Sequence, residues 1–146
     1  MSNIDPRLGT WKLNVAKSKF SPAYLAALKM APPKEETVVF RELGADEIEL
    51  TITGVQTDGK PITGKSTSPR QGGAVKLQQS PLPEGMTIVS TRIDPNNSLA
   101  TYMVNGKQFL VAQSVISKNG KSMHITFRGT DASGKPFEQL AAFLKQ

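Results

Sequence analysis

The chain of 146 residues contains no cysteine, which excludes disulfide bonds, thiolate nucleophiles and cysteine-ligated metals. Because His124 is the only histidine, a metal would need carboxylates for its other ligands, and we expect no metal site and no cofactor. No apolar run approaches the length of a membrane span, and residues 1–6 lack the basic and apolar regions of a signal peptide. These absences predict a cytoplasmic protein without stable membrane insertion, or a periplasmic or secreted protein whose signal peptide has been removed.

Charge is also not concentrated in any one part of the chain. The net charge is +6, with 38% hydrophobic and 21% charged residues. The basic residues are scattered, and Lys60, Lys107, Lys121 and Lys135 each follow a glycine of an expected turn. The nine aromatic residues are dispersed too, so we expect solubilising charge at hairpin ends and no nucleic acid partner. The length predicts a single domain over residues 1–146.

Apolar and polar residues alternate with the period of a β-strand over most of the sequence. We expect strands at 9–15, 37–41, 47–53, 62–68, 74–77, 86–93, 99–104, 108–117, 122–128 and 136–144. Short turns connect most of them, among them Asp58-Gly59, Asn105-Gly106 and Asn119-Gly120, and a loop is expected at 80–85. Sequential hairpins form a meander, and only closure removes its two long edges. The sequence therefore predicts an all-β, up-and-down antiparallel β-barrel of about ten strands (eight to ten). A β-sandwich is the alternative, but Greek-key crossings need longer connections.

One segment has the signature of a helix. Ser21 supplies an N-cap oxygen and Pro22 suits the first helical position. Good helix formers continue to Met30, where Ala31-Pro32-Pro33 ends the pattern. About two turns are too short to be stable alone. We therefore expect one short helix over 22–30, after the first strand, packed on the barrel as a partial cover.

The first predicted strand carries the motif that resembles a known family. Gly9-x-Trp11 resembles the Gly-x-Trp motif of lipocalins, and residues 9–13 (Gly-Thr-Trp-Lys-Leu) with Phe20 are similar to the start of fatty-acid-binding proteins. The chain also resembles small bacterial lipocalin-like proteins that begin Gly-Thr-Trp-Lys-Leu-Asn and carry Ser-Lys-x-Gly-Lys near the end, as residues 117–121 do. Lipocalins and fatty-acid-binding proteins are both calycins. This resemblance implies a barrel that binds a small hydrophobic or amphipathic ligand in its lumen.

The resemblance also implies structural roles and sets limits. It makes Gly9 and Trp11 determinants of the fold, and in lipocalins a basic residue late in the chain packs against the tryptophan. Arg128 and Lys145 are the candidates, and we choose Arg128 because a guanidinium stacks well on an indole. Fatty-acid-binding proteins hold a carboxylate with an Arg-x-Tyr in the last strand, where this chain has Ala-Phe-Leu at 142–144. Carboxylate binding in that manner is therefore not predicted.

The two Asn-Gly turns predict which side chains face the lumen. Two-residue loops place Lys118 opposite Lys121 and Val104 opposite Lys107. The more apolar face then carries Thr101, Met103, Leu110, Ala112, Ser114, Ile116, Met123, Ile125 and Phe127. The opposite face carries Tyr102, His124 and Arg128, and a β-bulge would exchange the two faces locally. We predict ligand contacts from the apolar face and from the strand 47–53, through Met103, Leu110, Met123, Ile125, Phe127, Leu50 and Ile52.

An enzyme on the same barrel is the alternative function. A polar group in an apolar lumen would have a shifted pKa and could transfer protons in an isomerase, cyclase or hydrolase acting on an apolar substrate. His124, Tyr102 and Glu138 are the candidate catalytic residues, although no nucleophile motif surrounds His124. A filled barrel that acts through its surface is a third possibility. The sequence leaves open the ligand, the catalytic question and the oligomeric state.

Overall fold

A computed structural model of the chain describes residues 5–79, 85–131 and 133–146, so most of the loop expected at 80–85 lies outside the described residues. The described part contains a short 3-10 helix, one α-helix and eleven β-strands. Their bounds are β1 (Gly9–Leu13), η1 (Val15–Lys17), α1 (Pro22–Ala27), β2 (Pro33–Leu43), β3 (Glu47–Gln56), β4 (Pro61–Pro69), β5 (Gly72–Ala74), β6 (Lys76–Gln79), β7 (Met86–Asp94), β8 (Asn97–Val104), β9 (Lys107–Ile116), β10 (Ser122–Thr130) and β11 (Pro136–Lys145). None of the helices described is long and apolar enough to span a membrane.

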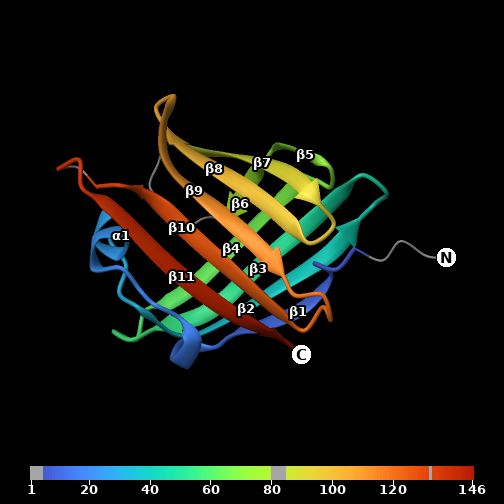
Figure 1. The fold of residues 1–146 in the computed structure, drawn as a ribbon, viewed down its shortest axis with the longest axis horizontal. Helices are drawn as coiled ribbons and strands as arrows, with labels where there is room; N and C mark the ends of the chain where they lie inside the picture. Colours follow the sequence, from blue (N-terminus) through green and yellow to red (C-terminus); the bar gives the residue numbers. More distant parts are fainter. Residues whose placement is uncertain (1–4, 80–84, 132) are drawn as a thin grey trace.

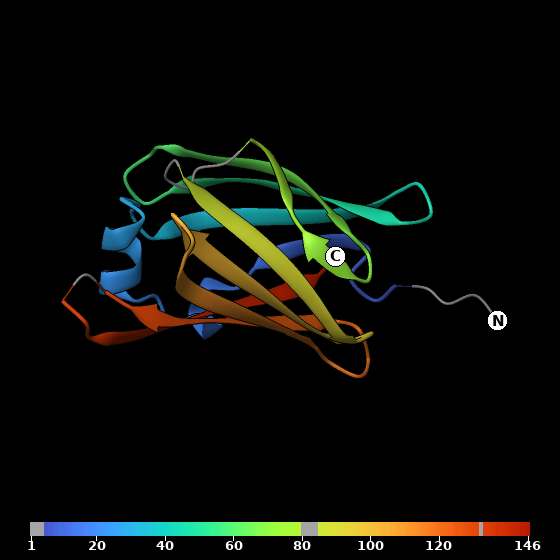
Figure 2. The ribbon, with the colours of Figure 1, turned by 90° about the horizontal axis from the view of Figure 1, so that it is seen from above.

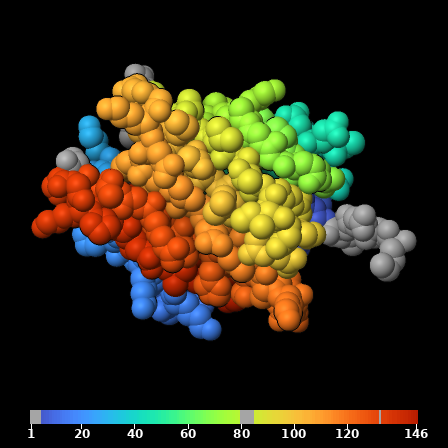
Figure 3. All heavy atoms as spheres, turned by 45° about the horizontal axis from the view of Figure 1, so that its top comes forward, coloured from blue at the N-terminus to red at the C-terminus, as the bar shows by residue number. Residues whose placement is uncertain are grey.

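The strands form one antiparallel sheet in the order β5-β7-β8-β9-β10-β11-β1-β2-β3-β4-β6. The sheet curls so that β2, β3, β4 and β6 form one wall and β8 to β11 form the facing wall (Figures 1 and 2). Seen from outside, β8 to β11 present a continuous surface (Figure 3). The predicted all-β, up-and-down barrel with one short helix is confirmed, with one strand more than the ten expected.

The additional strand comes from the segment that brings the two ends of the sheet together. The sequence pattern indicates one strand at 74–77, but residues 72–79 form two strands that meet at Val75. β5 pairs with β7, β6 pairs with β4, and the Val75 amide donates to the Ile88 carbonyl at 2.9 Å. A single piece of chain thus changes partners half-way along and bridges the two edges of the sheet.

The hairpins at the Asn-Gly turns largely have the predicted register. In the β9–β10 hairpin, Met123 pairs with Ile116, as predicted. In the β8–β9 hairpin, Val104 pairs with Lys107 as predicted, but Tyr102 pairs with Leu110, since a bulge leaves Phe109 without a partner. Side chains alternate along a strand. The bulge therefore places Tyr102 on the inner face of β8 and Met103, with its neighbour Thr101, on the outer face.

α1 closes one end of the barrel (Figure 1). The Ser21 hydroxyl accepts from the Tyr24 amide at 3.3 Å, and Pro22 is the first helical residue, as predicted. The helix ends at Ala27 instead of Met30, because Lys29 has a left-handed backbone conformation with φ of 55°. The Ser21 amide also donates to Gln139 Oε1 of β11 at 3.0 Å. The start of the helix is thereby tied to the last strand.

Two clusters of buried apolar residues fill the ends of the barrel. The helix-end cluster consists of Tyr24, Leu25, Leu28, Met86, Leu110, Ala112 and Phe137. The tryptophan cluster consists of Trp11, Val38, Ile116, Met123, Ala141 and Phe143. β11 runs from one cluster to the other, and Ile125 and Phe127 of β10 pack against both. The middle of the barrel therefore lies between two packed ends.

Trp11 is fully buried, and its indole Nε1 donates to the Arg7 carbonyl at 2.9 Å. The basic residue on its ring is Lys145 of β11, with Nζ 5.2 Å from the ring centre. Our choice of Arg128 was wrong: its side chain lies outside the barrel and donates to Glu138 at 2.8 Å. Lys145 is directly opposite Trp11 in the β1–β11 ladder, whereas Arg128 is on the outer face of β10.

Candidate ligand-binding cavity

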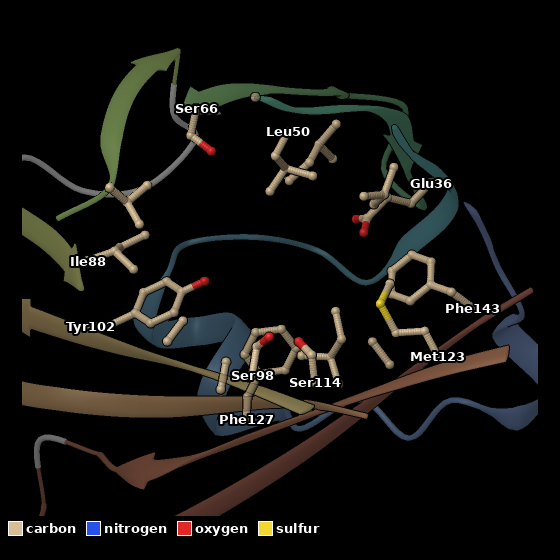
Figure 4. Close-up of a pocket in the computed structure, with 18 of the residues that line it drawn as sticks. Glu36, Leu50, Ser66, Ile88, Ser98, Tyr102, Ser114, Met123, Phe127 and Phe143 are labelled. Carbon is tan, nitrogen blue, oxygen red and sulfur yellow. The ribbon is translucent and has the colours of Figure 1, made fainter. Parts of the chain in front are cut away.

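The barrel encloses a cavity of about 310 Å³ between the two clusters (Figure 4). Apolar side chains from both walls make up most of its lining. They include Val38, Phe40, Leu50, Ile52 and Ile62 of β2 to β4, and Ile116, Met123, Ile125, Phe127 and Phe143 of β9 to β11. The lining is completed by Leu25 of α1 and by Leu28, the C-cap of that helix. Val75 and Leu77, from the segment 72–79 that bridges the two edges of the sheet, also belong to it. An apolar space of this size can bury an apolar guest and remove its surface from water.

Polar side chains also belong to the lining, and a few of them point clearly into this space. Glu36 of β2 and Tyr102 of β8 lie on opposite sides, and the polar end of each points into the cavity (Figure 4). Ser98 and Ser114 are cross-strand partners and lie beside Tyr102 on the same wall. Within the described residues, the carboxylate of Glu36 and the Tyr102 hydroxyl make no side-chain hydrogen bond. The cavity therefore has free polar groups that a guest can use.

Among the described residues that line this cavity, Glu36 is the only carboxylate. Burial raises its pKa from 4.5 to about 7, because the charged form loses its hydration in an apolar surrounding. It takes part in none of the six ion pairs of the described residues. Its proton is thus held weakly enough to be gained or lost near neutral pH.

The two tyrosines of the lining respond to the same surroundings. Burial raises the pKa of Tyr102 to about 12, with a smaller contribution from the charge of Glu36. The pKa of Tyr24 is also raised well above its ordinary value, chiefly by burial and then by Tyr102 and Glu36. Both phenols stay protonated at physiological pH, so Tyr102 presents a neutral hydroxyl to the cavity.

Two basic residues, Arg7 and Lys65, border the cavity. The guanidinium of Arg7 is held by Asp5, with 2.7 Å between Nη2 and Oδ2. The ammonium of Lys65 lies 3.6 Å from Glu49 Oε2, and Arg41 Nη2 binds the other oxygen of Glu49, Oε1, at 2.6 Å. Each of the two cations therefore has a carboxylate partner that it shares with a second cation, an arginine, and neither of the two is paired with Glu36.

No protein-family model and no curated protein sequence matches this chain. Solved structures match it over nearly its whole length. The fluorescent protein UnaG aligns with a TM-score of 0.65 and 16% identity, covering 95% of this chain and 96% of UnaG. Rv2717c from M. tuberculosis aligns with a TM-score of 0.54 and 19% identity, covering 97% of this chain and 92% of that protein. This chain has a calycin-like fold.

The calycin-like barrel places five of the seven predicted ligand contacts in the cavity lining. These five are Leu50, Ile52, Met123, Ile125 and Phe127. Leu110 is buried in the helix-end cluster and does not reach the cavity. Met103 is on the outer face of β8, because the bulge at Phe109 exchanges the faces of that strand. The part of these residues in binding stays a prediction.

The barrel does not bring the three candidate catalytic residues together. His124 lies on the outer face of β10 and is exposed, and the carboxylate of Glu138 is on the outside, paired with Arg128. Only Tyr102 reaches the cavity. Among the residues that the structure describes, no group of three histidine, aspartate or glutamate side chains is placed to bind a metal ion.

The sequence analysis missed Glu36, although the signal for it was present. Glu36, Val38 and Phe40 are spaced by two residues on β2, and all three line the cavity. Alternation from the apolar pair back along the strand leads directly to the carboxylate. The predicted strand began at residue 37, one residue after Glu36, so the alternation was not followed back to this side chain.

Proposed function

We propose that this protein binds a small hydrophobic or amphipathic molecule in the cavity of its barrel. The observation that carries the proposal is the apolar space between the two packed ends, which side chains from both walls and α1 line but do not fill. Its volume of about 310 Å³ is at the lower end of ligand sites, which favours one compact guest. The calycin-like fold supports the proposal by providing a closed wall around that space.

The test compares two neighbouring residues of β9 that face opposite sides. Ser114 lines the cavity, and Val115 is exposed at 39%. We expect the neutral fluorescent probe prodan to bind the unmodified protein and Ser114→Phe to weaken binding about tenfold or more, because the added ring occupies the space. Val115→Phe adds the same ring outside and should leave binding unchanged. Thermal unfolding of each variant, followed by Trp11 fluorescence, checks that the barrel is intact.

Two outcomes would contradict the proposal. One is the absence of probe binding to the unmodified protein, and the other is equal binding by the Ser114→Phe and Val115→Phe variants. If Ser114→Phe does not fold, Ala100→Leu makes a smaller insertion into the same lining. Its expected effect is in the same direction.

An enzyme is the second candidate, and one observation favours it. Glu36 faces an apolar cavity, and the pKa of its carboxyl group is raised to about 7. This value is suited to proton transfer near neutral pH. Tyr102 on the opposite side could donate a hydrogen bond to the reacting group. The discriminating measurement is the fate of a bound guest: an enzyme converts it and loses turnover in Glu36→Gln, whereas a binding protein releases it unchanged.

A further inference from the structure

We propose that the cavity selects guests with a cationic head, such as a protonated amine on an apolar body, and that Glu36 binds that head. This inference rests on the proposed binding function and names the class of its ligand. It depends on the position of one carboxylate and on the charges that surround it.

The position of Glu36 is determined by the strand and not by a loop. It pairs with Gly54 of β3, just after a register shift between Pro33 and Glu35. The two backbones approach so closely there that a Cβ on Gly54 would lie 2.1 Å from the Glu35 carbonyl oxygen. Because β2 pairs closely with β3 at this point, the carboxylate is already directed into the cavity before a guest arrives (Figure 4).

The carboxylate has no partner in the described part of the chain. The ion pairs there use Asp5, Glu42, Glu49 and Glu138, and Glu36 accepts no side-chain hydrogen bond. A buried carboxylate without donors is costly, and a guest that brings donors removes that cost. An ammonium group brings a positive charge and up to three donors.

The charge that points into the cavity opposes an anionic head beside Glu36. Arg7 and Lys65, the basic residues of the described lining, are each paired with a carboxylate outside it, which each shares with a second cation, an arginine. A fatty carboxylate placed beside Glu36 would meet a like charge there. An ammonium group would meet the opposite charge in a poorly hydrated space. The sign of the field thus distinguishes two guests that have the same hydrocarbon body.

The ionisation of Glu36 gives a second, independent signature. It faces Tyr24 of α1 and Tyr102 of β8, and the charged residues that border the cavity are Arg7 and Lys65. His124 is on the outside of the barrel. Since Glu36 must be ionised to attract an ammonium, the preference for amines should weaken as the pH falls from about 8 to about 5, through its pKa of about 7.

The experiment displaces prodan with decylamine, decanol and decanoate, which share one hydrocarbon chain and differ in the charge of the head. At about pH 8 we expect decylamine to bind at least about tenfold more tightly than decanol, the magnitude of one hydrogen bond to a charged group. Decanoate should bind more weakly than decanol. Glu36→Gln should abolish the preference for decylamine over decanol, with both affinities calculated from the prodan affinity measured for the same variant. The matched control is Glu35→Gln, which changes the exposed neighbour and should keep the preference.

The outcomes separate this inference from the proposed function. If prodan binds and all three compounds displace it equally, the binding function stands and the selection by charge is wrong. An amine preference that persists in Glu36→Gln, or that does not change with pH in the unmodified protein, also overturns it. If no apolar compound binds at all, the proposed function itself fails. Because the pH series uses the unmodified chain, the test does not depend on the folding of a variant.

Discussion

The ammonium of Lys145 lies 5.2 Å from the centre of the Trp11 ring. The two residues are cross-strand partners in the ladder that joins β1 to β11, the first and last strands. Lys145 Nζ also donates to the Pro6 carbonyl at 3.3 Å. One side chain near the end of the chain thus contacts both the buried indole and the segment leading into β1. This contact supports the join between the two ends of the meander.

Replacing Lys145 with alanine should reduce the free energy of unfolding by about 1 kcal/mol, because the cation–π contact and the packing of the aliphatic stem are lost. Arg128→Ala removes a basic residue whose ion pair is exposed on both sides, and its effect should be below about 0.5 kcal/mol. Chemical denaturation followed by Trp11 fluorescence measures both. Equal effects of the two substitutions would contradict the assignment of Lys145 as the partner of Trp11.

Glu36 should make the empty protein less stable as the pH rises. Its pKa is raised from 4.5 in an unperturbed glutamate to about 7 in the fold, so the folded state favours the protonated form. Stability is therefore highest below about pH 4.5 as far as this group is concerned, and is lost as the pH rises to about 7. Glu36→Gln should raise the free energy of unfolding by about 2 kcal/mol at about pH 8 and have little effect at about pH 4. Glu35→Gln, measured in parallel, should show no such pH-dependent gain.

Gly54 is expected to be intolerant of any side chain. A Cβ there would overlap the backbone of Glu35, at 2.1 Å from its carbonyl oxygen. Since backbone must move to relieve this overlap, Gly54→Ala should cost about 3 kcal/mol or more. The matched control is Gly44→Ala, in a left-handed turn with φ of 70° and no atom within 4 Å of the added carbon, which should cost only about 1 kcal/mol. Thermal unfolding compares the two, and a larger loss at Gly44 would refute the steric argument.

Asp5 binds two arginines at the end of the barrel opposite α1. Its Oδ2 lies 2.7 Å from Arg7 Nη2 and 2.9 Å from Arg92 Nη1, and the side chain is only 5% exposed. Asp5→Asn should cost about 3 kcal/mol, because it leaves both guanidinium groups without their carboxylate. Glu138→Gln, which breaks an exposed pair with Arg128, is the control and should cost below about 0.5 kcal/mol.

The same aspartate should contribute to acid sensitivity. Burial opposes its ionisation, but hydrogen bonds from Arg7, the charge of Arg7 and a hydrogen bond from Arg92 together outweigh burial and hold its pKa far below the ordinary 3.8. A lowered pKa in the fold means that this stabilisation is present above about pH 4 and declines as the pH falls further. Acid unfolding curves of the unmodified protein and of Asp5→Asn should therefore converge at low pH. Parallel curves over that range would contradict the role of Asp5.

Local rules account for the parts of the fold that were predicted from sequence. Asn119-Gly120 admits only a tight turn, and its register placed Met123 opposite Ile116, as the structure has it. At Asn105-Gly106 the same rule holds for the pairs Val104–Lys107 and Met103–Gln108. It fails at the next pair, because the bulge at Phe109 shifts the register so that Tyr102 pairs with Leu110. Nothing in the local sequence signals it, since Phe109 suits either face of a strand.

The remaining errors concern contacts between residues far apart in the sequence. A guanidinium stacks well on an indole, which favoured Arg128, but the choice between Arg128 and Lys145 depends on which residue pairs with Trp11 across β1 and β11. Glu36 lay one residue outside the predicted strand 37–41 and was not among the predicted site residues. Its inward position follows from the period of β2, which the apolar pair Val38 and Phe40 determines together with the pairing with β3. In both cases the pairing of strands decided which side chain lies at the site.

The change of partners at Val75 bears on how quickly a guest can leave. Within the described residues, β5 and β6 hold their neighbours through ladders of three residue pairs each, whereas β10 and β11 share nine. Val75 and Leu77 also line the cavity, so breaking either short ladder exposes the interior while the rest of the barrel keeps its hydrogen bonds. We expect amide hydrogens of residues 72–79 to exchange faster than those of β10. The residence time of a guest is then governed by this local opening and can be changed without altering the lining that recognises it.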